Sequence, residues 1–210
     1  MPGTKIAEDV RREQIIRAAY AIAADRGLAA VTIRDVALRA ETSPGLVIFH
    51  FVTKDRLILA LLDWVLATTT ALTVGEDIQR IDHPLERLIA LLRQEMARVT
   101  REPKRIRVFF EFWSAGIWHR RIGTRMQREL DRYREAFRPM AEAVLAAEPE
   151  RFEGVTATAL TALAVSFIKG CAIQSMIDPQ LDSTEFLDAA EALLAPPNRP
   201  YPDAYTTPRS

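Results

Sequence analysis

Cysteine is nearly absent from this 210-residue sequence, in which Cys171 is the only one. A single cysteine excludes an internal disulfide and any cysteine-rich metal site. An excess of one charge is also missing, since 28 Lys and Arg residues balance 28 Asp and Glu residues. That balance argues against a histone-like or membrane-coating protein. The first ten residues contain no apolar segment of the kind that a secretory signal requires, so a cytoplasmic protein is expected.

Signals for β-strands are scarce as well. Alternating β-branched and polar residues do not occur, whereas apolar residues recur at helical spacing along almost the whole chain. Hydrophobic residues make up 49% and charged residues 27%, which is typical of a globular protein with a sizeable core. The sequence therefore predicts an all-α fold.

The helical pattern divides the chain into a head, a larger bundle and a tail. Three head helices are expected, one from Arg11 to Gly27, one beginning after Thr32 and one beginning after Ser43. In the bundle, periodicity and proline positions predict helices over 53–70, 84–100, 104–119, 122–147, 155–177 and 183–195. Four prolines between 196 and 202 predict a flexible tail. The predicted domains are thus 1–53, 54–195 and 196–210.

The second and third head helices are short and are joined by a tight turn at Glu41 and Thr42, which are the proportions of a helix-turn-helix unit. In such a unit one short helix enters the DNA major groove, while its neighbour crosses the phosphate backbone. Thr32, Ser43 and Thr53 each precede a helix whose free N–H groups favour phosphate. The head is therefore a candidate DNA-binding domain.

Four segments of the head carry a resemblance to a known family. They are Ile15–Ala19, Gly27, Val31–Ala37 and the stretch from Pro44 through Phe51 and Lys54 to Leu57. Together they resemble the DNA-binding domain of the TetR family. Further along, Phe112–Ala115, His119 and Asp178–Pro179 are similar to one branch of that family, the repressors of choline-to-glycine-betaine genes.

The resemblance implies a homodimer that places two recognition helices in successive major grooves of a near-palindromic double-stranded DNA operator. It also implies a small-molecule effector bound in each C-terminal bundle, with dimerisation through the last two long helices. Thr32 and Arg34 would meet phosphate or a base edge, and Lys54 would bind a phosphate. The residues implied to face the groove are Thr42, Ser43, Pro44, Gly45, Leu46, Phe49 and His50.

Three positions depart from the family's usual pattern. Glu41 replaces a common glycine, and a left-handed backbone there would cost roughly 1–2 kcal/mol. Ile48 replaces a tyrosine whose hydroxyl contacts phosphate, and Thr42 replaces a valine. These departures leave the predicted fold unchanged but alter the groups that would read the operator.

The third head helix is poor in groups that read bases. No Arg, Asn or Gln lies between Ser43 and Phe51, so bidentate recognition of guanine or adenine by this helix cannot occur. Leu46 and Phe49 are candidates for contacts with thymine methyl groups. Much of the affinity is therefore expected from phosphate contacts, with Arg34 and Lys54 foremost. Lys5, Arg11 and Arg12 are further candidates, although the two arginines also fit a solvated helix face, and His50 also fits a helix-end residue.

An aromatic stripe marks the candidate effector pocket. Phe109, Phe112, Trp113 and Ile117 share one helical face, a pattern that also fits ordinary core packing. Such a concentration of aromatic rings suits an apolar or cationic ligand, and the resemblance makes a quaternary ammonium conceivable. The candidate wall residues are Trp64, Phe109, Phe112, Trp113, Ile117, Met126 and Met176. No cofactor or metal is expected.

Residues 155–177 are apolar enough to suggest a membrane-spanning helix. Lys169 lies well inside the segment, so a helix buried in a subunit interface is the preferred interpretation and no membrane association is expected. Ser166 and Gly170 would let a partner helix approach closely.

Two other classes of protein compete with a regulator. An enzyme would need a catalytic group, but the three histidines are dispersed and Cys171 fits a buried, inert thiol better than a nucleophile. A helical ligand-binding or interaction protein without sequence-specific DNA binding is the other alternative. Neither class accounts for the head motif, so the sequence predicts a non-enzymatic, ligand-responsive transcriptional regulator, most simply a repressor that an effector releases from DNA.

Overall fold

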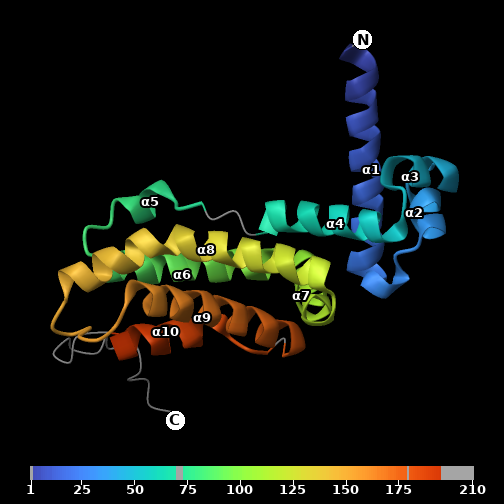
Figure 1. Ribbon diagram of the computed structural model, residues 1–210. Helices are drawn as coiled ribbons and strands as arrows, with labels where there is room; N and C mark the ends of the chain where they lie inside the picture. Colours follow the sequence, from blue (N-terminus) through green and yellow to red (C-terminus); the bar gives the residue numbers. More distant parts are fainter. Residues whose placement is uncertain (1, 70–72, 179, 195–210) are drawn as a thin grey trace.

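The computed structural model describes residues 2–69, 73–178 and 180–194, with the side chains of residues 2–7, 100 and 183 left aside. Within these ranges every regular element is a helix, which confirms the predicted all-α fold. The predicted tail, residues 196–210, lies outside the described residues. Figure 1 shows a small head at one end and an elongated body that α4 joins to it.

The head contains four elements. They are α1 (Pro2–Arg26), a single 3-10 turn η1 (Leu28–Ala30), α2 (Ile33–Arg39) and α3 (Pro44–Phe51). The first helix begins at Pro2 rather than at Arg11, so it is longer than predicted, and the η1 turn was not anticipated.

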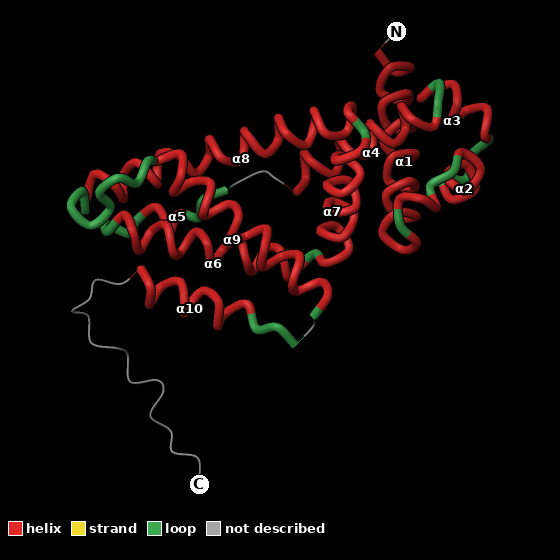
Figure 2. The backbone as a smooth tube through the Cα atoms, turned by 60° about the horizontal axis from the view of Figure 1, so that its bottom comes forward, coloured by secondary structure: helices red, strands yellow, loops and turns green. Residues whose placement is uncertain are grey.

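The body contains the remaining seven described helices. They are α4 (Lys54–Thr69), α5 (Glu76–Gln79), α6 (Pro84–Arg101), α7 (Pro103–Trp118), α8 (Arg120–Ala147), α9 (Ala157–Ile177) and α10 (Ser183–Leu194). Each predicted body helix is present, with ends shifted by at most two residues, and only the one-turn α5 was missed. Figure 2 shows that short loops join most of these helices.

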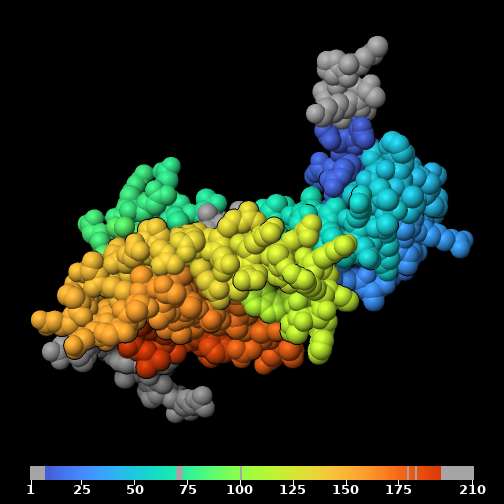
Figure 3. All heavy atoms as spheres, viewed as in Figure 1, coloured from blue at the N-terminus to red at the C-terminus, as the bar shows by residue number. Residues whose placement is uncertain are grey.

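One hydrophobic core joins the head to the near end of the body. It contains Ile15 of α1, Val47 of α3, Leu61 of α4 and Phe112 of α7, all of them fully buried. A second core lies between α6, α8, α9 and α10 and includes Phe137 and Ile168. The first core crosses from α1 to α7, so side chains of the head pack directly against those of α7. In Figure 3 the head and the body accordingly form one continuous surface.

The apolar helix α9 is the one described helix that is long and apolar enough to cross a membrane. It packs against α6, α7, α8 and α10, which accounts for one side of its apolar surface. On another side Leu163 and Ile177 remain 63% and 81% exposed. Part of the apolar surface of α9 therefore belongs to the core, and part lies on the surface of the single chain.

Candidate functional site

Three hydroxyl side chains cap the helices that surround the head's exposed end. The Thr32 hydroxyl accepts a 3.1 Å hydrogen bond from the Asp35 backbone N–H and donates one of 2.7 Å to the Asp35 carboxylate. Ser43 accepts from the Leu46 N–H at 3.1 Å, and Thr53 accepts from the Arg56 N–H at 3.2 Å. These caps fix where α2, α3 and α4 begin and orient their N-termini.

Two cations lie beside these helix ends without a partner. Arg34 and Lys54 are exposed, and neither forms a hydrogen bond or ion pair with another described residue. Their charges are therefore available to an external anion. By contrast, Arg26 and Arg39 lie within 3.9 Å and 3.6 Å of Asp35 and Asp25.

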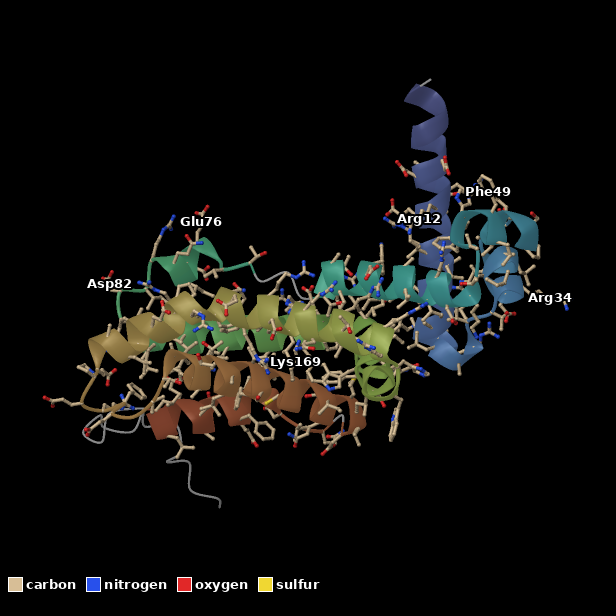
Figure 4. The ribbon with its side chains drawn as sticks, viewed as in Figure 1. Arg12, Arg34, Phe49, Glu76, Asp82 and Lys169 are labelled. Carbon is tan, nitrogen blue, oxygen red and sulfur yellow. The ribbon has the colours of Figure 1, made fainter. Side chains whose placement is uncertain are left out.

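The third head helix presents an apolar surface to solvent. Phe49 is 70% exposed, Ile48 is 42% exposed and Leu46 is half-buried. Figure 4 shows Arg34 and Phe49 on the outer side of the head, away from Lys169 in the body. Among the other predicted contact residues, Thr32, Ser43, Pro44 and Gly45 are exposed, and Thr42 and His50 are half-buried. The ten predicted contact residues thus lie on α2, on α3, at the start of α4 and in the connections that precede α2 and α3.

The turn between α2 and α3 has a left-handed residue. Glu41 adopts φ 50°, the conformation whose cost of roughly 1–2 kcal/mol was anticipated from the missing glycine. The next residue, Thr42, donates its backbone N–H to the Ala37 carbonyl at 2.9 Å and so closes the turn.

A second strained residue, which sequence reasoning missed, separates α3 from α4. Val52 adopts φ 64° and ψ −45°, and the Thr53 N–H donates a 2.6 Å hydrogen bond to the Phe51 carbonyl across it. This geometry is a γ-turn, which is rare and strained for a β-branched residue. The available signal was the short distance along the chain between the two helices.

Arg12 of α1 reaches the third head helix. Its guanidinium carbon lies 5.1 Å from the centre of the Phe51 ring, a cation–π contact that keeps its charge near α3. Figure 4 labels Arg12 on α1, at about the level of α3. Arg11 is half-buried, and the side chain of Lys5 lies outside the described part of the chain.

Two cavities in the described part of the body are lined by predicted wall residues. The smaller, between α7, α8 and α9, has a volume of about 10 Å³, and the larger, near the C-terminal end of α9, has a volume of about 350 Å³. Phe109, Trp113 and Met126 of the predicted wall line the smaller cavity, and Met176 lines the larger one.

The other three predicted wall residues line neither cavity. Phe112 is fully buried in the core that joins head and body, and Ile117 is 70% exposed near the end of α7. Trp64 contacts Tyr20, with the two rings tilted and their centres 5.0 Å apart. The seven predicted residues are therefore not brought to one place.

Sequence reasoning assigned no pocket role to Lys169 or Glu129, the two charged residues of the smaller cavity. The Lys169 Nζ atom lies 4.6 Å from the centre of the Phe109 ring and 4.7 Å from that of Tyr133. Burial, assisted by the nearby charge of Arg98, lowers the pKa of Lys169 to about 8. Glu129, Leu130 and Tyr133 complete the lining. A lysine in the middle of an apolar helix was the signal that could have pointed to this cavity.

A buried ion pair lies next to the cavity. The Glu95 carboxylate is 1% exposed, accepts a 2.6 Å hydrogen bond from the Tyr133 hydroxyl and pairs with Arg98 at 2.6 Å. Burial and the Glu95 charge raise the pKa of the Tyr133 hydroxyl, which therefore stays protonated. Cys171 of α9 is 3% exposed, and burial raises its thiol pKa, which makes it a poor nucleophile.

Comparison with known proteins identifies both halves of the chain. Residues 15–61 match the bacterial regulatory proteins of the tetR family, and residues 84–196 match the C-terminal domain of the BetI-type transcriptional repressors.

Among similar proteins, a transcriptional repressor of Mycobacterium tuberculosis is 45% identical over 62 residues, which are 30% of this chain and 33% of that protein. The BetI regulator of Stenotrophomonas maltophilia is 30% identical over 124 residues, 59% of this chain and 63% of the relative. The matched segments thus span about a third to just under two thirds of these relatives. A transcriptional regulator from Saccharomonospora viridis, solved in complex with choline, shares the fold with a TM-score of 0.63 and 19% identity, over 84% of this chain and 90% of that one.

Proposed function

Because the chain belongs to the tetR family, with a C-terminal part of the BetI-type repressors, we propose that it is a ligand-responsive DNA-binding transcriptional regulator. In the proposed function it is a non-enzymatic cytoplasmic repressor, and a small-molecule effector releases it from a near-palindromic operator. The observation that carries the proposal is the exposed end of the head, where Arg34 and Lys54 lie unpaired beside capped helix N-termini. This arrangement suits a phosphate backbone, because free N–H groups and unpaired cations both bind its oxygens.

In the proposed complex α3 lies in the major groove. Phe49 and Leu46 contact thymine methyl groups, while Thr42, Ser43, Pro44, Gly45 and His50 face the groove edge. The Thr32 and Ser43 hydroxyls already serve as caps, so at these positions the phosphate would meet the helix N-terminus rather than a free side chain.

A near-palindromic operator requires two heads, which we assign to a homodimer formed through α9 and α10. Leu163, Ile173 and Ile177 of α9 and Leu193 of α10 are exposed in the single chain. Ser166 is exposed on the same helix, and a Cβ atom at Gly170 would meet no atom of this chain within 4 Å. An apolar face with small residues lets a second copy approach closely and bury it.

The proposed release mechanism uses the contacts of α7 with the head and of α8 with α4. Lys104 of α7 pairs with Asp25 of α1 at 2.9 Å, and Arg125 of α8 pairs with Asp63 of α4 at 2.9 Å. A ligand that parts α7 from α8 would move these contacts and change the separation of the two heads. A hundredfold loss of DNA affinity requires about 2.7 kcal/mol of differential ligand binding.

Selection of DNA sequences from a random duplex pool by the purified protein tests the proposal, with DNA from upstream of its own gene as a second substrate. We expect enrichment of one near-palindromic site, with half-sites about one helical turn apart. Binding without enrichment of any site would contradict sequence-specific regulation and favour a helical ligand-binding or interaction protein.

A further inference from the structure

The C-terminal end of α4 is held by cations from other helices. The last four carbonyl groups of an α-helix have no partner within the helix, and nearby Lys or Arg side chains stabilise them. No basic residue lies in the last turn of the described α4, which ends at Thr69. The cations that its carbonyls contact come instead from α6 and α7. Figure 1 shows α4 running from the head to the body, so its two ends belong to different parts of the molecule.

Arg98 of α6 makes the more buried of these contacts. Its Nη1 atom donates a hydrogen bond to the backbone carbonyl of Thr69, a residue that is 1% exposed. Arg105 of α7 donates to the Thr68 carbonyl at 3.3 Å, and its guanidinium carbon lies 5.8 Å from the centre of the Trp64 ring. Because water does not reach Thr69 in the folded protein, loss of the Arg98 donor would leave its carbonyl without a replacement.

A buried carboxylate fixes the Arg98 side chain. Both oxygens of Glu95, which is 1% exposed, accept from Arg98 Nε at 3.2 Å, and one of them also accepts from Nη2 at 2.6 Å. The Tyr133 hydroxyl of α8 donates to the same carboxylate at 2.6 Å. A guanidinium group is a rigid planar fork, so Arg98 binds Glu95 along one edge and Thr69 with the remaining nitrogen. A buried network whose members are all bonded favours a single arrangement of its helices.

We propose that Arg98 is a positioning residue for operator binding, which fixes the C-terminal end of α4 to α6 and thereby sets the separation of the two heads. This inference rests on the proposed function, in which the two heads of a dimer bind the half-sites of one operator. The other end of α4 carries Lys54, and Leu57 packs in the core of the head. α4 has 16 residues and is about 24 Å long, so a tilt of about 10° moves one end by about 4 Å, comparable with the rise of about 3.4 Å per base pair.

The spacing of the half-sites should therefore depend on this contact. A duplex whose half-sites lie one base pair too close or too far apart forces the heads away from their resting separation. To follow it, α4 of the native protein must break the hydrogen bond between Arg98 and Thr69. The free energy of that bond then contributes to the preference for the correct spacing, and a protein that lacks the bond follows the displaced half-site at lower cost.

Three duplexes test this on the full chain: the selected operator, and the same half-sites with one central base pair added or removed. The measured quantity is the ratio of the affinity for the selected spacing to that for an altered spacing. Arg98→Met is expected to lower this ratio by roughly tenfold, as for the loss of one hydrogen bond to a charged group. Arg98→Lys keeps the charge without the fork and is expected to give an intermediate ratio. A merely structural role would reduce the amount of folded protein, which lowers all affinities equally and cancels from the ratio.

Arg87→Met is the matched control. Arg87 lies on the same helix, is also half-buried and donates to a backbone carbonyl, that of Ile81 at 2.8 Å, which precedes α6 and does not belong to α4. Its substitution should leave the spacing ratio unchanged. Tyr133→Phe removes only the hydroxyl that binds Glu95, and it is expected to lower the ratio by less than Arg98→Met. This milder change tests the network if Arg98→Met does not fold.

Amide hydrogen exchange of residues 66–69 follows the same contact without DNA. Arg98→Met is expected to speed this exchange roughly tenfold relative to Arg87→Met, because the last turn of α4 opens more often. Unchanged exchange, an unchanged spacing ratio in the folded Arg98 or Tyr133 variants, or an equal fall in Arg87→Met would overturn the positioning role. A native protein that selects no operator would instead overturn the proposed regulator, and the positioning role with it, whereas a selected operator with an unchanged ratio overturns the positioning role alone.

Discussion

The carboxylate of Glu111 accepts a 2.6 Å hydrogen bond from the backbone N–H of Leu28, the first residue of η1. Glu111 lies on α7 between Phe109 and Trp113, whose rings line the smaller cavity. The preceding residue, Gly27, has φ 85°, and a Cβ atom there would lie 3.4 Å from the same carboxylate. One helix therefore contacts both the smaller cavity and the turn that ends α1.

Replacement of Glu111 by alanine is expected to lower the free energy of unfolding by about 1.5–3 kcal/mol, because the half-buried Leu28 N–H loses a charged acceptor. Glu111→Gln keeps an acceptor and is expected to lose less. Urea denaturation measures both changes. Glu150→Ala, at an exposed position, is the control and should shift stability by less than about 0.5 kcal/mol. Equal losses in the Glu111 and Glu150 alanine variants would show that the contact adds no stability.

Val52→Gly is expected to stabilise the protein. Relief of the left-handed strain contributes about 1–3 kcal/mol, and the extra freedom of glycine in the unfolded chain offsets about 0.5–1 kcal/mol of it. Val52 is 56% exposed, so little packing is lost. Thermal and urea unfolding should both show the gain, with a smaller one for Val52→Ala, which still carries a Cβ atom. A less stable glycine variant would mean that Val52 is not strained.

The Glu41 and Val52 turns show what sequence could and could not predict. The left-handed Glu41 was anticipated because it replaces a glycine that is common at this position of a recognisable motif. At Val52 the short connection between the two helices indicated a tight turn, but no residue type there indicated a positive φ. The body helices followed from apolar periodicity, which depends on local spacing. The residues of the cavity wall could not be predicted in the same way. Phe112 and Ile117 share a helical stripe with Phe109, but Phe112 is buried in the core that joins head and body, whereas Ile117 lies at the surface. Lys169 lines the smaller cavity only because α9 packs against α7 and α8, and apolar periodicity does not predict which helices pack together.

Stability should rise between about pH 8 and about pH 10 because of Lys169. Its pKa is about 8 in the folded protein and about 10.4 in an unfolded chain. Below pH 8 both states hold the proton and the buried charge is destabilising. As the pH rises, the folded state loses the proton first, and stability increases.

Urea midpoints at pH 7.5 and 9.5, for the native protein and Lys169→Met, measure this effect. The native protein is expected to gain stability relative to the variant as the pH rises. Cys171, whose pKa burial raises, acts in the opposite direction, but it is present in both proteins and cancels in the difference. A pH-independent difference would show that Lys169 has an ordinary pKa.

Phe49 is expected to read thymine through its methyl group. Substitution of uracil for each thymine of the selected operator removes these methyls one at a time and keeps every hydrogen-bonding group. Where Phe49 contacts a methyl, affinity should fall about fourfold, which corresponds to about 0.8 kcal/mol for one buried carbon. Phe49→Ala should bind the thymine and uracil duplexes equally at that position. If the native protein tolerates uracil at every position, the proposed apolar contacts are wrong.

The central claim, that the head binds operator DNA through unpaired cations, is tested most directly by the affinity for the selected operator at two salt concentrations. Fluorescence anisotropy compares the native protein, Lys54→Ala, and Arg128→Ala as a control at an exposed position of the body. We predict salt-sensitive binding that Lys54→Ala weakens, with a slope of log affinity against log salt that is smaller by about one unit per lost phosphate contact. Arg128→Ala should match the native protein. Salt-independent binding, or identical affinities and slopes for all three proteins, would contradict the claim.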